Sequence, residues 1–161
     1  MMRLILVRHA KSDWSDPSLS DHDRPLNKRG RRQAPLLGTM VREYLGRNNR
    51  VIVSTATRAQ QTWSALDLSE EVSDVHDEAD LYMTSASTVA EIAKITHLEG
   101  VVDTLILVGH NPTTENAIRM LTNESHVMRT SMAAVIELSE ETAEIVTILD
   151  PRTLENRPSA S

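Results

Sequence analysis

The sequence has no cysteine and no long hydrophobic run. The absence of cysteine excludes disulfide bonds, thiolate metal sites and cysteine nucleophiles, and it is typical of a reducing compartment such as the cytoplasm. The longest apolar runs, residues 4–7 and 105–108, are far too short to span a bilayer. The N-terminus lacks the apolar stretch of a secretory signal. We therefore expect a cytoplasmic protein with no membrane partner.

Several common active-site motifs are also missing. The five glycines form neither a P-loop nor the GxGxxG motif of dinucleotide-binding proteins. No GxSxG sequence is present, so a serine hydrolase of the α/β type is disfavoured. Four histidines show no HExxH or paired spacing, and we interpret them as surface or satisfied polar residues: His22, His76, His97 and His126.

Charge is distributed unevenly along the chain. Residues 1–50 contain 11 Lys and Arg against 5 Asp and Glu, whereas residues 51–161 contain 6 against 18. The net charge of −6 disfavours nucleic acid as a partner, because binding to its phosphate backbone requires a broad basic face. We interpret the basic run NKRGRR at 27–32 as the solvated start of a helix, although the local excess could also serve a small anion.

Strand and helix patterns alternate along the chain. Short apolar or β-branched runs predict strands at 3–7, 50–56, 71–76, 103–111, 133–139 and 143–149, the last two as an antiparallel pair at a sheet edge. Amphipathic spacing and capping signals predict helices at 27–48, 57–69, 85–98 and 112–123.

This alternation predicts a single α/β domain over residues 1–150, followed by a loose polar tail at 151–161. The expected architecture is a three-layer α/β/α sandwich around a mostly parallel central sheet. In such sheets, ligands bind beyond the carboxyl ends of the strands. The residues that follow the strands are therefore the candidates for function.

Each of the three clearest strands leads into a basic or imidazole side chain. Arg8 and His9 follow the first strand, Arg58 begins the helix after the second, and Gly109 and His110 end the strand whose apolar run is 104–108. Parallel strands would bring these side chains to one sheet edge, where helix N-termini add backbone N–H donors. Arginine offers paired donors, and histidine can act as donor or nucleophile. The pattern favours a site for a tetrahedral oxyanion, with phosphate as the leading ligand.

Three motifs carry a family resemblance. In order, LVRHA at 6–10, STATRAQQTW at 54–63 and LILVGHNP at 105–112 resemble the histidine phosphatase superfamily, whose fold is phosphoglycerate-mutase-like. RHAKSDW, followed by DHDRPLNKRG, more closely resembles its small phosphohistidine phosphatase branch. The resemblance extends to about residue 150. Ala10 stands where the family motif has glycine.

The resemblance implies roles for four residues in the chemistry. His9 corresponds to the family's nucleophile and would become a phosphohistidine during turnover. Arg8, Arg58 and His110 correspond to its phosphate-binding pocket, and they would hold the phosphoryl oxygens.

Two further positions follow from the same resemblance. Ser15 falls where relatives often carry a polar residue that contacts phosphate. Asp80 lies near the segment that often supplies the acid protonating the leaving group, and Glu78 is a second candidate. The alternative is that Asp80 and Glu78 only solvate a loop.

The resemblance implies hydrolysis of phosphohistidine in a phosphorylated protein through a covalent phospho-His9 intermediate. No cofactor is expected, and no metal is required, because the arginines neutralise the developing charge. About 150 ordered residues leave little room for a domain capping the site, which favours a protein side chain as substrate. The alternatives are a phosphomonoesterase acting on a small phosphate ester by the same mechanism, and a non-catalytic phosphate-binding module.

Overall fold

The computed structural model describes residues 1–155. The strands form one sheet in the order β3-β2-β4-β1-β5-β6. The strands are β1 (Met2–Arg8), β2 (Asn49–Ser54), β3 (Asp74–Glu78), β4 (Thr104–Gly109), β5 (Ala133–Leu138) and β6 (Ala143–Leu149). The helices are α1 (Lys28–Arg42), α2 (Thr57–Leu66), the short 3₁₀ helix η1 (Ala79–Leu81), α3 (Ala86–Glu99), α4 (Thr113–Thr122) and α5 (Arg152–Glu155).

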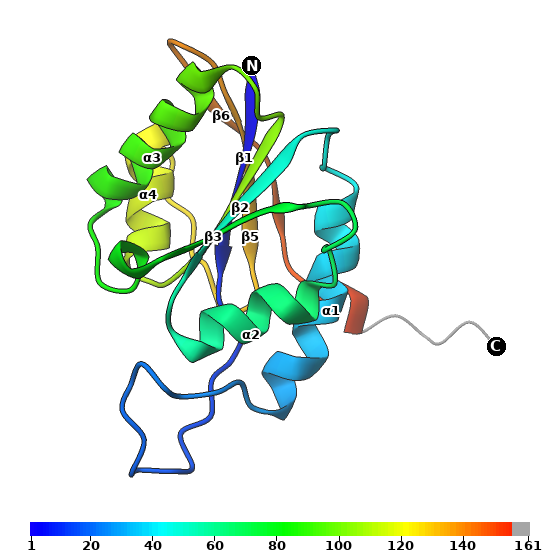
Figure 1. Cartoon of the computed structure of the whole chain (residues 1–161), viewed down its shortest axis with the longest axis vertical. Coiled ribbons are helices and arrows are strands. Elements are labelled where there is room, and N and C mark those ends of the chain that lie inside the picture. The colour runs from blue at the N-terminus through cyan, green and yellow to red at the C-terminus, as the bar shows by residue number, and fades with distance from the viewer. Residues whose placement is uncertain (156–161) are drawn as a thin grey trace, which may run out of the picture.

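The sheet is mostly parallel and covered on both faces. Strands β3, β2, β4 and β1 are parallel, whereas β5 and β6 are antiparallel and complete the β1 side of the sheet. Helices α1 and α2 cover one face, and α3 and α4 cover the other (Figure 1). The predicted three-layer α/β/α sandwich and its antiparallel edge pair are confirmed.

The uninterrupted apolar run of β1 follows from this double cover. Ile5 and Val7 pack towards α1 and α2, whereas Leu4 and Leu6 pack towards α3 and α4. Because side chains alternate between the two faces of a strand, a strand buried on both faces needs apolar residues at successive positions. The same pattern holds in β4, which lies at the centre of the sheet.

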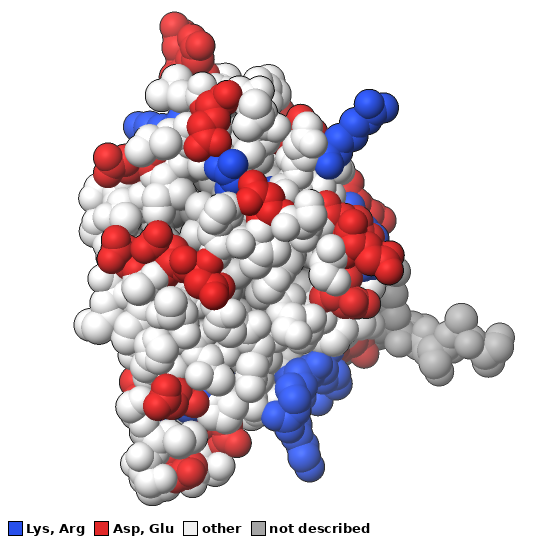
Figure 2. Space-filling model, in the orientation of Figure 1, with Lys and Arg blue, Asp and Glu red and all other residues white. Residues whose placement is uncertain are grey.

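The basic run at 27–32 is the solvated start of α1, as predicted. The Asn27 side chain caps the helix by accepting from Gly30 N, and four basic side chains that follow it are exposed: Lys28, Arg29, Arg31 and Arg32. Figure 2 shows a basic cluster where Figure 1 places the start of this helix, while acidic side chains are spread over much of the visible face.

Helix α1 is shorter than its apolar periodicity predicts, and it continues through Pro35 without beginning there. The helix ends at Arg42. In the connection that follows, Asp103 Oδ2 accepts from Arg47 N at 3.0 Å and from Asn48 N at 2.8 Å. These contacts turn the backbone into β2. The connection from α1 to β2 is therefore held by a residue distant in sequence, which local periodicity does not report.

The prediction of a loose tail from residue 151 is wrong for its first residues. Pro151 is buried, and α5 follows it. Glu155 binds α1, accepting from Arg32 Nε at 2.8 Å and from Gln33 Nε2 at 2.8 Å. The rest of the predicted tail, 156–161, lies outside the described residues. Within 1–155, no helix combines the length and apolar character that crossing a bilayer demands.

Candidate active site

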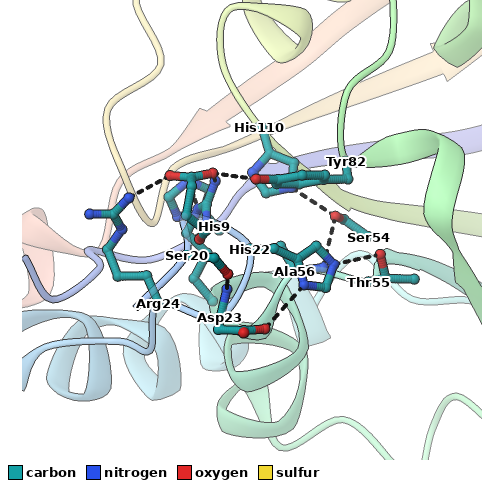
Figure 3. A network of polar contacts seen from close by, with 12 residues as sticks. His9, Ser20, His22, Asp23, Arg24, Ser54, Thr55, Ala56, Tyr82 and His110 are labelled. Atoms are coloured by element: carbon teal, nitrogen blue, oxygen red, sulfur yellow. Dashed lines mark hydrogen bonds and ion pairs between the residues drawn. The ribbon is translucent and has the colours of Figure 1, made fainter. Parts of the chain in front are cut away.

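The carboxyl ends of three neighbouring parallel strands form the candidate site. β4 lies between β1 and β2, and Arg8 is level with Gly109 across the β1–β4 pair. His9 and His110 therefore emerge side by side, with ring centroids 5.1 Å apart (Figure 3). Arg58, in the first turn of α2, reaches the same place, with its Nε 3.3 Å from His9 Nε2.

His9 is held as a neutral imidazole with one defined tautomer. Its Nδ1 lies 2.7 Å from the Ala10 carbonyl oxygen, which only accepts, so Nδ1 carries the proton. The adjacent backbone is fixed, because Ala10 N donates to Thr62 Oγ1 at 2.9 Å. Burial lowers the pKa of His9 to about 3, against a smaller opposing effect of the Ala10 carbonyl. At neutral pH, Nε2 is therefore unprotonated, and its lone pair accepts from Arg58 Nε at 3.3 Å.

Ser54, at the end of β2, favours the same tautomer in His110. Ser54 Oγ accepts from Ala56 N at 3.3 Å, so its hydroxyl proton is free to donate to His110 Nε2, 2.8 Å away. The proton of His110 then lies on Nδ1, which is buried and has no partner in the described chain. Burial, followed by the charge of Arg58, lowers the pKa of His110 to about 4. His110 is thus a neutral N–H donor at physiological pH.

An aspartate from the segment after β1 lies over these groups. The Asp21 carboxylate accepts from Arg58 Nη2 at 3.0 Å, Tyr82 OH at 2.5 Å and Arg24 Nη2 at 2.6 Å. Figure 3 shows the contacts from Arg24 and from Tyr82 approaching from opposite sides. The hydrogen bond from Tyr82, together with those from Arg24 and Arg58, holds the pKa of Asp21 far below its ordinary value. This carboxylate is therefore ionised.

Arg8 completes the cationic surroundings of the site. Its Nη1 donates to the Met128 carbonyl oxygen at 2.9 Å, while its Nε is buried and unpaired within the described residues. Burying a donor without an acceptor is costly, so an oxyanion that accepts from Arg8 Nε and His110 Nδ1 would relieve that cost. With the donors of Arg58, these groups are chemically suited to bind a phosphoryl group beside His9.

Three residues named from the family resemblance are not in contact with this cluster. Ser15 is exposed, and its backbone N donates to Asp13 Oδ1 at 2.7 Å. Glu78 Oε1 caps η1 by accepting from Asp80 N at 3.1 Å. The Asp80 side chain is exposed and forms no hydrogen bond or ion pair with any described residue. The roles predicted for Ser15 and Asp80 therefore gain no support from a contact.

Four residues of the site were not singled out from the sequence: Ser54, Asp21, Tyr82 and His22. His22, interpreted from the sequence as a surface or satisfied polar residue, has its Nε2 3.0 Å from Thr55 Oγ1 and its ring edge-on to Tyr82 at 4.8 Å. Two sequence motifs could have pointed to three of these residues. Ser54 lies in STATRAQQTW, and Asp21 and His22 open DHDRPLNKRG.

We expect the rings of His9 and His110 to stay neutral from pH 8 down to about pH 5. Burial lowers both pKa values, to about 3 and about 4, so protonation sets in only when the pH falls towards these values. NMR titration of ring-labelled protein measures this directly, with a histidine peptide of ordinary pKa, about 6.5, as reference. Titration of either ring near the reference value would contradict the lowered pKa values and the neutral state assigned to these rings.

Ser54→Ala is expected to weaken binding of inorganic phosphate by about 10-fold, the effect of losing one hydrogen bond of typical net strength. Without the serine hydroxyl, nothing holds the proton of His110 on Nδ1. Calorimetric titration at neutral pH measures the affinity. Ser139→Ala is the matched control, because Ser139 Oγ contacts only Thr142 in the distant β5–β6 hairpin. An unchanged affinity in Ser54→Ala would rule out this role.

Sequence relatives cover most of the chain. An uncharacterized chloroplastic protein of Arabidopsis thaliana is 32% identical over 146 residues, 84% of this chain and 66% of that protein. An uncharacterized protein of Mycobacterium tuberculosis is 41% identical over 108 residues, 67% of this chain and 65% of that protein. The chain thus matches just under two thirds of the length of each relative.

Solved structures share the fold. The protein histidine phosphatase SixA complexed with tungstate has a TM-score of 0.83 and 22% identity, covering 95% of this chain and 99% of its own. A phosphoserine phosphatase of Entamoeba histolytica with bound phosphoserine has a TM-score of 0.75 and 12% identity, covering 96% and 100%. The α-ribazole phosphatase of Shigella flexneri has a TM-score of 0.73 and 18% identity, covering 93% and 97%.

The family follows from the sequence match. The model of the histidine phosphatase superfamily (branch 1) matches residues 4–94, more than half of the chain. The matched region includes β1 with Arg8 and His9, and α2 with Arg58. The sandwich fold agrees with that of the solved phosphatases. The chain therefore belongs to the histidine phosphatase superfamily.

Proposed function

We propose that this chain hydrolyses phosphohistidine in proteins through a covalent intermediate on His9. The observation that carries the proposal is that, in the part of the chain the structure describes, no protonated carboxyl group is hydrogen-bonded to the site. Among the described residues, Asp21 is the only carboxylate hydrogen-bonded to Arg8, His9, Arg58 or His110, and three donors keep it ionised. A phosphate ester of an alkyl alcohol leaves as a strong base and needs such a donor. An imidazole that carries a proton on its other nitrogen does not, because it leaves as neutral imidazole.

In the first step, the lone pair of His9 Nε2 forms a bond to phosphorus. The P–N bond of the substrate, whose ring is protonated on the other nitrogen, breaks, and its electron pair returns to the ring, which leaves as neutral imidazole. Arg8, Arg58 and the Nδ1–H of His110 hold the phosphoryl oxygens and stabilise the charge in the transition state. The Ala10 carbonyl keeps the proton on His9 Nδ1, so the attacking nitrogen remains unprotonated.

In the second step, water attacks the phosphorus of phospho-His9. The bond from phosphorus to Nε2 breaks, its electron pair returns to His9, and the water proton leaves with the phosphate product or to solvent. Arg8 and Arg58 supply the positive charge throughout this scheme. We therefore expect a chelator to leave the rate unchanged.

The likeness to SixA supports a phosphohistidine substrate, and the tungstate in that structure is a tetrahedral oxyanion as phosphate is. The connection from η1 to α3 is also short, residues 82–85, so no inserted domain lies there over the site. A small-molecule phosphomonoesterase is the second candidate. It is favoured by the fold shared with phosphoserine phosphatase and by Tyr82, an O–H donor bound to Asp21 whose ring lies edge-on to that of His110, with centroids 5.6 Å apart.

A substrate panel distinguishes the two candidates. The purified protein is given a phosphohistidine-bearing protein, phosphoramidate, phosphoserine and p-nitrophenyl phosphate, and kcat/KM is measured for each. We expect the P–N substrates to exceed phosphoserine by at least about 100-fold, the range that general acid catalysis typically contributes. His9→Ala serves as the control for contaminating phosphatases. Faster hydrolysis of phosphoserine would support the second candidate and overturn the first.

A further inference from the structure

The ionised carboxylate of Asp21 is an unexpected group in a site for phosphate. It lies on a segment whose ends are joined by the Ser12–Leu26 bridge and by Asp13 N donating to Pro25 O at 2.7 Å. The segment between these ends is largely exposed, yet Asp21 reaches back to Arg58, at the floor of the site. A carboxylate this close to the phosphate donors repels a dianionic substrate and competes for Arg58.

The contacts of Asp21 leave one acceptor position open. Oδ2 accepts from both Arg58 and Tyr82, whereas Oδ1 accepts only from Arg24. Each carboxylate oxygen has two lone-pair positions, so Oδ1 has one left. The Asp21 side chain is 50% exposed, while that of Arg58 is 10% exposed. The Asp21 carboxylate is therefore accessible to a bound substrate, whereas Arg58 is largely covered.

Phosphohistidine differs from a phosphate ester in the atom it can offer to this position. Its ring has a second nitrogen, away from the P–N bond, which can carry a proton and donate a hydrogen bond. A serine or sugar phosphate has no such donor attached to its leaving oxygen. An ionised acceptor thus favours the phosphorylated imidazole and disfavours the esters.

We propose that Asp21 is a specificity-determining residue, which accepts a hydrogen bond from the far ring N–H of the phosphohistidine substrate. The inference rests on the proposed function and adds the group that recognises the leaving imidazole. It also explains how the reaction proceeds without a proton donor. With the far nitrogen protonated, cleavage returns the P–N electron pair to the near nitrogen, and the ring leaves as neutral imidazole with its proton still facing Asp21.

Three small substrates test this assignment in the full-length protein. Phosphoimidazole has the far ring nitrogen, phosphoramidate has a P–N bond but no ring, and p-nitrophenyl phosphate is an ester. Asp21→Asn removes the charge. The backbone carbonyl oxygen of residue 21 and the amide oxygen can still accept from the two terminal nitrogens of Arg58. Asp21→Ala is the second variant, and Asp16→Asn is the matched control. Asp16 is in the same segment, and among the described residues its side chain is hydrogen-bonded only to Ser18.

We expect Asp21→Asn and Asp21→Ala to lower kcat/KM for phosphoimidazole at least 10-fold. The same variants should leave phosphoramidate and p-nitrophenyl phosphate unchanged or improve them, chiefly through a lower KM, because competition for Arg58 is relieved. Asp16→Asn should match the wild type on all three. An equal loss on all three substrates would show that Asp21 only positions Arg58, and an unchanged preference in both variants would also overturn the inference.

Different results would disprove the proposed function and the role of Asp21. If the wild type hydrolyses esters but neither phosphoimidazole nor phosphoramidate, then P–N hydrolysis itself is wrong. If the wild type hydrolyses phosphoimidazole and the Asp21 variants keep its preference, the proposed function stands and only the role of Asp21 is lost. Thermal unfolding of each variant shows whether the protein measured is folded.

Discussion

His9→Ala is expected to lower kcat by at least about 10⁴-fold, the scale on which enzymes lose activity when a nucleophile is removed. The substitution removes the Nε2 lone pair and leaves Arg8, Arg58 and His110 in place. Inorganic phosphate should therefore bind with an affinity within a few fold of the wild type. Steady-state kinetics and calorimetric titration measure the two quantities on the same preparation.

The control for this experiment is His126→Ala. His126 lies away from the site, with its Nε2 3.4 Å from Glu124 Oε1, and its loss should leave both kcat and phosphate affinity unchanged. A His9→Ala protein that retains more than a few per cent of wild-type turnover after repurification would exclude His9 as the nucleophile.

Arg58→Ala is expected to damage binding and turnover together, lowering kcat/KM by about 10³-fold. The guanidinium contacts His9 Nε2 through Nε and Asp21 through both terminal nitrogens. Its removal takes away donors for the phosphoryl oxygens and also releases the segment that carries Asp21. KM should therefore rise while kcat falls, unlike the pattern expected for His9→Ala.

Arg58→Lys separates charge from geometry. Lysine keeps the positive charge but lacks the planar paired donors of arginine, so we expect it to recover binding more than turnover. A variant with alanine at this position that kept its phosphate affinity would show that Arg58 does not bind the phosphoryl group.

The sheet and the proximity of His9 to His110 could be predicted from the sequence. Both depend on local apolar patterns and on the rule that ligand sites lie at the carboxyl ends of parallel strands. Apolar runs identified β1, β2 and β4, and parallel strands place their carboxyl ends at one edge. No knowledge of side-chain packing was required. The same reasoning placed Arg58 at the site, because it begins the helix that follows β2.

Asp21 and Tyr82 could not be found in this way. Their hydrogen bond joins residues 61 positions apart, one in an irregular segment and the other just after a 3₁₀ helix. Neither segment has a periodicity that fixes its direction. The resemblance pointed to Asp80 in that neighbourhood, and the fold instead brings in the side chain two residues later.

The ends of the elements were missed for a related reason. Asp103 sets the turn after α1, and contacts of Glu155 with Arg32 and Gln33 accompany α5. These contacts join parts of the chain that are distant in sequence. Helix propensity and polarity report only the neighbours of a residue, so they extended α1 and described the last residues as a tail.

Trapping the phosphoenzyme tests the central claim most directly. The wild-type protein is mixed with phosphoramidate, quenched in alkali within milliseconds to seconds, digested, and examined by mass spectrometry under conditions that preserve phosphohistidine. We predict a single phosphorylated site at His9, formed and lost at rates consistent with turnover, and absent from His9→Ala. Phosphate found on another residue, or product formed in a burst with no phosphorylated His9 at any time, would contradict the covalent mechanism.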